Sequence, residues 1–291
     1  MNYESQGHEW LAKGDKKLRS LGWFGNKNEE AAECYERAAN QFKLAKSWAM
    51  AGQTYMRLAE VSVKLESRHD AANAYVEAAK ALVRVDRRQA IDCMQRAVGL
   101  YTDMGRLSMA ARQLRDIGDV LEKEGSKEES LTFYEQAGDL FSTENSTAEA
   151  TKCFLKVAHT SAELERYERA VGIFETAARA AMDNNLLRYS AKGYLLCAGL
   201  CALAGADLRT VRDCLVRHAD VDHSYEGSRE HQLISDLADA TEQGSVEAFT
   251  DAVQKFDAMT RLDPWKTTML VRAKRRVAAA PEGGVDEEDL T

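Results

Sequence analysis

The sequence predicts an all-α fold: a solenoid of helical hairpins, capped by a C-terminal helical bundle. Composition is the first observation, since only 2 of the 291 residues are proline and alanine, leucine, glutamate, lysine and arginine dominate. These five side chains lose little rotamer freedom on a helix. The second observation is an apolar pattern that recurs about every twenty residues, and the third is a turn-forming segment between many of its copies.

Residues 1–28 are predicted to form an N-terminal helix followed by an apolar loop. In the loop, glycines lie beside the large apolar side chains of Leu21, Trp23 and Phe24. Tryptophan and phenylalanine partition into the headgroup region of membranes, so one interpretation is a wedge that contacts lipid. The other interpretation is that the rings tuck under the first helix. The sequence favours neither of them.

Residues 29–205 are predicted to form the solenoid. Each copy has a small residue, a bulky residue four positions later and an apolar or small residue three further on, so all three lie on one helix face. We expect one helix of about 14 residues per copy. Neighbouring copies must stack, because a single such helix cannot bury its apolar stripe, and the stacked pairs resemble tetratricopeptide arrays. The nine copies begin at Ala31, Ala51, Ala71, Ala90, Ala110, Ser130, Ala150, Ala170 and Ser190.

Turn-forming residues lie between the copies, at Glu66–His69, Asp103–Arg106, Glu124–Lys127 and Asp183–Asn185. Ser126 and Glu129, just before an apolar run, have the spacing of a capping box. In that motif each of the two side chains accepts a hydrogen bond from the backbone N–H of the other residue.

The twenty-residue rhythm ends near residue 205, and residues 206–280 are predicted to form a helical bundle. Pro264 suits a first helical turn, where a backbone N–H would have no partner within the helix. Residues 281–291 include two glycines and four successive acidic residues, which predicts a flexible acidic tail. The expected helices are Leu208–Ala219, Ser228–Gln243, Val246–Thr260 and Pro264–Ala280.

Composition and motifs exclude several classes of function. The net charge of −8, with both signs interspersed, argues against a nucleic-acid-binding protein. The sequence shows no secretory signal and no apolar run long enough to span a bilayer, which predicts a cytoplasmic protein with reduced, buried cysteines. Phosphate-binding loops, HExxH motifs and paired CxxC motifs are absent, so we expect no catalytic residues, no enzymatic activity and no cofactor.

Metal binding is not expected from the sequence either. The six histidines show no metal-ligand spacing with cysteines. Cys197 and Cys201 lie one turn apart on one expected helix face and could form half of a site. Packing in the core is the preferred interpretation of that pair.

Basic residues recur along the repeats, at Lys43, Lys46, Arg106, Arg112, Lys152, Lys156, Arg188 and Lys192. If they share one face of the solenoid, they would attract an elongated acidic partner. The alternative is ordinary surface charge, and periodicity does not tell which of them share a face. The acidic tail also has two interpretations: a solvating segment, or a ligand whose Leu290 enters a pocket elsewhere.

Several local strings together resemble the soluble NSF-attachment proteins of the alpha type. They are Tyr101–Arg106, Tyr189–Lys192, Arg261–Asp263, Thr267–Leu270 and the terminal acidic-leucine tail, and the resemblance extends from about Glu29 to the C-terminus. It implies an adaptor for SNARE disassembly in vesicle trafficking, peripherally associated with membranes. Several copies would bind the assembled SNARE four-helix bundle, recruit the hexameric ATPase NSF and stimulate its ATP hydrolysis.

The resemblance also assigns residues to these partners. Leu21, Trp23 and Phe24 match the family's membrane-contacting loop, which is shorter here, and Gln243 replaces an acidic residue at its ATPase-facing end. The residues that match the SNARE-binding surface are Arg106, Arg112, Lys152, Tyr189, Lys192 and Arg229, and those that match ATPase-binding positions are Asp207, Asp239, Glu242 and Leu290. The alternative function is a generic tetratricopeptide-like protein-binding scaffold, which would need neither the apolar loop nor the acidic-leucine tail.

Overall fold

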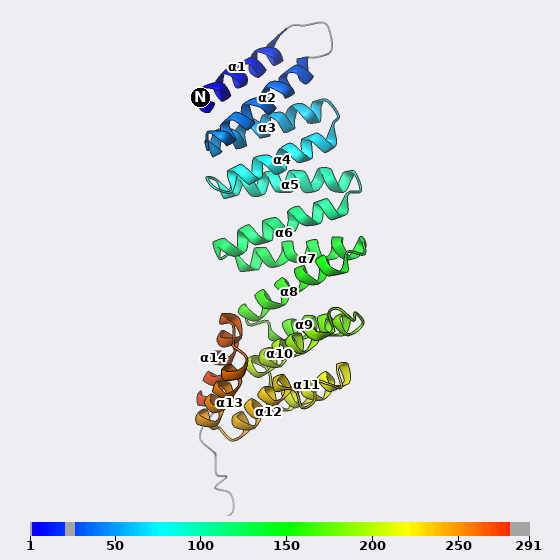
Figure 1. Cartoon of the computed structure of the whole chain (residues 1–291), viewed down its shortest axis with the longest axis vertical. Coiled ribbons are helices and arrows are strands. Elements are labelled where there is room, and N and C mark those ends of the chain that lie inside the picture. Colours follow the sequence, from blue (N-terminus) through cyan, green and yellow to red (C-terminus); the bar gives the residue numbers. More distant parts are fainter. Residues whose placement is uncertain (1, 21–26, 280–291) are drawn as a thin grey trace, which may run out of the picture. The chain divides into compact units, whose positions relative to one another are not determined.

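The computed structural model describes residues 2–20 and 27–279 (Figure 1). Within those residues every regular element is an α-helix, which confirms the all-α prediction. The chain divides into two compact units, residues 1–153 (unit 1) and residues 154–291 (unit 2), which we describe separately. The predicted boundary between residues 205 and 206 stays a prediction.

Unit 1 is a stack of antiparallel helices in which α1 to α6 each pack against the next helix along the chain (Figure 1). The repeat copies that begin at Ala31 through Ala150 each fall on one helix, and the small first residue of every one of these copies is buried. The helices are α1 (Tyr3–Arg19), α2 (Lys27–Leu44), α3 (Trp48–Lys64), α4 (Arg68–Leu82), α5 (Arg87–Asp103), α6 (Leu107–Glu124), α7 (Lys127–Thr143) and the beginning of α8 (Thr147–Glu163).

Short turns make these helices longer than predicted: α2 to α7 have 15–18 residues each. Five of the described turns of unit 1 share one geometry. A residue in the left-handed conformation is followed by one whose N–H bonds the carbonyl five positions earlier, as in a Schellman motif. Ser47 N–H, for example, donates to the Phe42 carbonyl at 2.9 Å. The left-handed residues are Lys46, Glu66, Gly105, Gly125 and Asn145.

This turn geometry contradicts the capping box predicted at Ser126. The Ser126 N–H already donates to the Leu121 carbonyl of the preceding helix, at 3.0 Å, so it is not available to a Glu129 side chain. The Ser126 side chain makes no capping hydrogen bond. The prediction was wrong because Gly125 and Ser126 both end α6 and precede α7. The Ser126 N–H that a capping box needs is used to close the end of α6.

Large rings fill the space between neighbouring helices of unit 1, and small residues make room for them. The Tyr134 ring is fully buried, and its hydroxyl donates to Asp119 Oδ1 at 2.7 Å and to Glu122 Oε2 at 2.9 Å. Gly118 lies against this ring: a Cβ atom at that position would be 2.7 Å from Tyr134 Cε1. Tyr134, the bulky residue of its copy, therefore fills the space between helices as predicted, against a glycine that the repeat pattern does not include.

The core of unit 2 is built around one apolar helix, α10. α10 carries a continuous run of buried residues from Leu195 to Ala204 and packs against α9, α11, α12 and α14. A helix that is apolar on all sides is expected to lie inside a domain. The helices of unit 2 are the end of α8, α9 (Tyr167–Met182), α10 (Arg188–Gly205), α11 (Leu208–Val221), α12 (Arg229–Glu242), α13 (Val246–Met259) and α14 (Pro264–Ala279).

The C-terminal helices were predicted to within two residues at each end, and α14 begins at Pro264 as expected. Side chains of α14 bond backbone carbonyls at the ends of two other helices. Arg272 donates to the carbonyls of Ala162 and Glu163, at 2.8 and 3.0 Å, and Arg276 donates to that of Leu203, at 3.0 Å. The last carbonyls of a helix lack partners within it, so these arginines stabilise the ends of α8 and α10.

Candidate functional site

Two of the predicted SNARE-binding residues gather around one carboxylate in unit 1. Lys152, on α8, donates from Nζ to Glu149 Oε1 at 2.6 Å. The hydrogen bond from Lys152, with the charges of Arg115 and Arg112, holds the pKa of Glu149 below its ordinary value. Arg112 and Lys152 are both exposed. The structure thus brings together two cations that lie forty positions apart in the sequence.

Arg115 is a third cation of this cluster, and the sequence analysis missed it. Its Nη1 donates to Glu149 Oε2 at 2.8 Å, and its Nη2 lies 3.5 Å from Asp116 Oδ1. Arg115 follows Arg112 by three positions, so the two share one face of α6. That spacing could have identified it. We call Arg112, Arg115 and Lys152 the basic cluster of unit 1.

The remaining SNARE-binding candidates lie elsewhere. Arg106 is exposed at the start of α6, in unit 1. In unit 2, Tyr189 and Lys192 lie three positions apart near the start of α10, with 82% of the Tyr189 surface exposed. Arg229 is the first residue of α12, also in unit 2. The grouping of all six residues on one binding surface stays a prediction.

The acidic candidates of unit 2 have a basic partner that sequence reasoning overlooked. Arg212, on α11, donates from Nη2 to Asp239 Oδ1 at 2.8 Å and to Glu242 Oε2 at 2.6 Å, which joins α11 to α12. Asp207 accepts the Thr210 N–H at 2.7 Å as the N-cap of α11, and this hydrogen bond lowers its pKa. Arg212 offsets part of the negative charge of the predicted ATPase-binding surface.

The other candidates lie outside the described residues. These are the membrane-contacting residues Leu21, Trp23 and Phe24, together with Leu290 of the acidic tail. Within residues 2–20 and 27–279, no helix combines the length and the apolar character that crossing a bilayer requires. Cys197 and Cys201 lie inside the core of unit 2, where burial raises the pKa of Cys197 to about 12.

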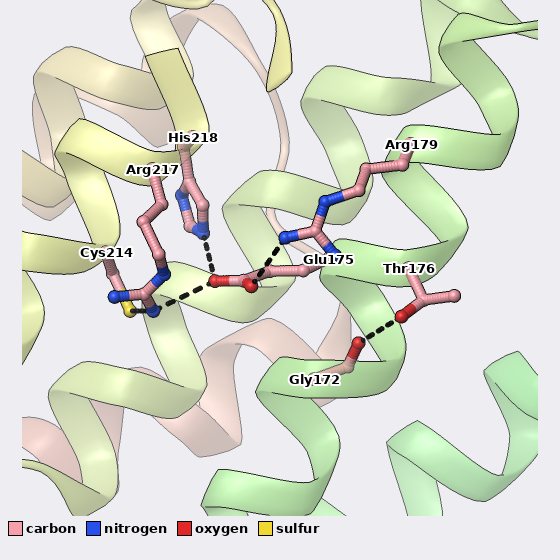
Figure 2. Close-up of polar contacts among 7 residues, drawn as sticks. All are labelled: Gly172, Glu175, Thr176, Arg179, Cys214, Arg217 and His218. Carbon is pink, nitrogen blue, oxygen red and sulfur yellow. Dashed lines mark hydrogen bonds and ion pairs between the residues drawn. The ribbon is translucent and has the colours of Figure 1, made fainter. Parts of the chain in front are cut away.

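A buried polar cluster between α9 and α11 is a second finding that sequence reasoning missed (Figure 2). Glu175 Oε1 lies 3.3 Å from His218 Nε2 and accepts a hydrogen bond from Arg217 Nη2 at 3.1 Å. Arg217 Nη2 also lies 2.8 Å from Cys214 Sγ, and Arg179 Nη2 donates to Glu175 Oε2 at 3.2 Å. The expectation that no histidine and cysteine have metal-ligand spacing overlooked Cys214 and His218, which are one helical turn apart.

The pKa of Glu175 shows which form of the cluster is stable. Burial raises the pKa of this carboxyl group, but the hydrogen bonds and charges of His218 and Arg217 outweigh burial and hold it at about 2. Glu175 is therefore ionised at neutral pH although only 7% of its surface is exposed. The cluster is therefore a buried carboxylate, Glu175, with the guanidinium of Arg217 bound to it.

Comparison with known proteins gives matches along almost the whole chain. The family described as "Soluble NSF attachment protein, SNAP" matches residues 5–278. An alpha-soluble NSF attachment protein of Vitis vinifera is 41% identical over 98% of each chain, and that of Homo sapiens is 38% identical over 99% of this chain and 98% of its own. A probable vesicular-fusion protein sec17 homolog of Schizosaccharomyces pombe is 37% identical over 97% of each chain.

Among solved structures, a signal-transduction ATPase with a tetratricopeptide-repeat sensor from Pyrococcus horikoshii matches with a TM-score of 0.51. It is 13% identical, over 94% of this chain and 44% of that chain. At this identity the likeness shows the fold alone, and it supports the tetratricopeptide-like character of the helical repeats.

Proposed function

This chain belongs to the soluble NSF attachment protein family, and from that membership we propose that it is an adaptor for the disassembly of SNARE complexes in vesicle trafficking. It binds the assembled SNARE bundle, recruits the hexameric ATPase NSF and stimulates ATP hydrolysis by NSF. Relatives that match along almost the full length are named attachment or vesicular-fusion proteins. The chain is an adaptor and not an enzyme.

The basic cluster of unit 1 is the observation that best supports SNARE binding. Arg112 and Lys152 were assigned to that surface by resemblance, and both lie beside Glu149. The surface of the SNARE bundle in this family's complexes is largely acidic. The basic cluster has three positive side chains, and the two carboxylates beside it are Glu149 and Asp116, so one positive charge is left in excess. Such complementarity sets the orientation and the rate of association, with a strong dependence on salt.

A pull-down on immobilised SNARE bundle tests this proposal. The double substitution Arg112→Glu with Lys152→Glu should weaken binding of the full chain at least about tenfold at low salt, because each reversal changes the local charge by two. The matched control is Lys64→Glu with Arg88→Glu, which makes the same charge change at exposed positions of α3 and α5 in the same unit. Equal binding by the two double variants would remove the basic cluster from the interface.

The C-terminal end is proposed to bind NSF through Asp207, Asp239, Glu242 and Leu290. The same pull-down, repeated with NSF added, tests recruitment: NSF should be retained only when this chain and the SNARE bundle are both present. A generic protein-binding scaffold would retain its partner without recruiting NSF. Truncation after residue 280 distinguishes the two proposals. It should abolish stimulation of NSF if the chain is an adaptor, and it should leave partner binding unchanged if the chain is a generic scaffold.

Membrane association and copy number complete the proposal. Several copies bind one SNARE bundle, and each copy gains affinity from the effective concentration that its neighbours and the membrane provide. Trp23 and Phe24 are proposed to contact lipid. Flotation with liposomes should therefore recover the full chain, and the double substitution Trp23→Ser with Phe24→Ser should abolish that recovery while SNARE binding in solution stays intact.

A further inference from the structure

The cluster of Glu175, Cys214 and His218 has the geometry of a metal site. One potential ligand atom from each residue lies within 4.8 Å of the others, and all three residues are buried. Cys214 and His218 come from one face of α11, and Glu175 comes from α9. Two ligands one helical turn apart, with a third from a neighbouring helix, is a common way to hold a transition metal.

His218 has the weakest polar contacts of the three residues, although it is fully buried. Its side chain is fully buried, and neither ring nitrogen has a hydrogen-bond partner of good geometry. Nε2 is directed at Glu175 Oε1, 3.3 Å away (Figure 2). The Glu175 contact is therefore the one polar contact of this imidazole among the described residues, and it is long for a hydrogen bond. Such weak pairing of a buried imidazole is unfavourable, whereas a metal ion would give Nε2 a strong partner.

Arg217 indicates where such an ion would lie. Its guanidinium contacts both Glu175 Oε1 and Cys214 Sγ, so it already supplies positive charge to two of the three ligands. The Arg217 side chain is 45% exposed. Arg217 and Cys214 also line a surface hollow of about 780 Å³ beside α9 and α11, which gives an ion a path to the thiol. Arg217 can turn into solvent without crossing the core.

We propose that Glu175, Cys214 and His218 form a binding site for a zinc ion, which displaces the guanidinium of Arg217 and links α9 to α11 within unit 2. The donor set is a thiolate, an imidazole and a carboxylate, which zinc accepts, and a water molecule would complete the tetrahedron. Binding releases the Cys214 thiol proton to solvent. The charges then balance, since a divalent cation meets one carboxylate and one thiolate, and no net charge is left buried.

Cobalt titration of the full chain, stripped of metal with a chelator, tests this site. Cobalt is a spectroscopic substitute for zinc, and a cobalt–thiolate bond gives a charge-transfer band in the near ultraviolet. We expect this band together with the intense visible bands of tetrahedral cobalt, at one equivalent per chain, and we expect zinc to bleach them. The absence of a charge-transfer band in the wild-type chain would overturn the proposal without recourse to any variant.

Substitutions then identify the ligands. Cys214→Ser should abolish the charge-transfer band, and the matched control Cys93→Ser, at a buried cysteine of α5, should leave it unchanged. Arg217→Gln should tighten cobalt binding by about tenfold or more, because it removes a cation that competes for two of the ligands. Retention of the band in folded Cys214→Ser, or weaker binding by folded Arg217→Gln, would refute the site. Circular dichroism verifies that each variant is folded.

Discussion

Replacement of Gly118 by alanine tests whether close helix packing determines the stability of unit 1. Gly118 lies on α6, and the added Cβ would be 2.7 Å from Cε1 and 2.8 Å from Cδ1 of Tyr134. Carbon atoms normally approach to about 3.5–4.0 Å. The ring therefore has to move by most of an ångström, although its hydroxyl is held by Asp119 and Glu122.

The magnitude follows from three opposing contributions. Alanine is favoured over glycine in a helix interior by about 1 kcal/mol. Overpacking of a well-packed core costs about 1–3 kcal/mol, and weakening one hydrogen bond to a carboxylate costs about 1.5 kcal/mol more. Steric and hydrogen-bond costs together exceed the gain in helix propensity. We expect Gly118→Ala to lower the free energy of unfolding by about 2 kcal/mol.

Gly99 provides a matched control of opposite sign. It lies on α5 in the same unit, is exposed, and would have no atom within 4 Å of an added Cβ. Gly99→Ala should therefore raise the free energy of unfolding by up to about 1 kcal/mol. Urea unfolding followed by far-ultraviolet circular dichroism measures both variants. The reasoning is refuted if Gly118→Ala stabilises as Gly99→Ala does.

Further expectations concern unit 2 and the tail. Burial lowers the pKa of His159 below 6.5. In acid the unfolded protein therefore binds more protons at this histidine than the folded protein does. The melting temperature of the wild-type chain should fall between about pH 7 and pH 5, by more than that of His159→Gln. Arg212→Ala should change stability by less than about 1 kcal/mol, since its ion pairs are exposed, but it should strengthen NSF binding by freeing Asp239 and Glu242; weaker binding would contradict their assignment. Leu290→Ala should leave SNARE binding intact and abolish stimulation of ATP hydrolysis, and undiminished stimulation would remove the tail's assigned role.

The repeat architecture was predictable because its information is local. The apolar stripe of each copy lies within eight residues, so the helices of both units could be placed from the sequence. The backbone conformation that closes each turn was harder to predict from the sequence. Lys46, Glu66 and Glu165 adopt the left-handed conformation that glycine or asparagine usually provides, and nothing in their side chains indicates it.

The clusters of charged and ligating residues were only partly predictable. Arg112 and Lys152 were identified by resemblance, but the pairing of Arg115 with Glu149 depends on which faces of α6 and α8 meet. Glu175 lies on α9, so its contact with Cys214 and His218 requires the packing of α9 against α11. Periodicity indicates which face of a helix is buried, and leaves open which residue of the next helix lies opposite.

The Schellman turns have a consequence for how such a chain can evolve. Each of these turns is closed by carbonyls of the helix that it ends, so a copy that ends in one carries its own termination signal and depends little on the sequence of the next copy. Tandem duplication or loss of two copies would therefore preserve the direction of the chain and the closure of the adjoining helices.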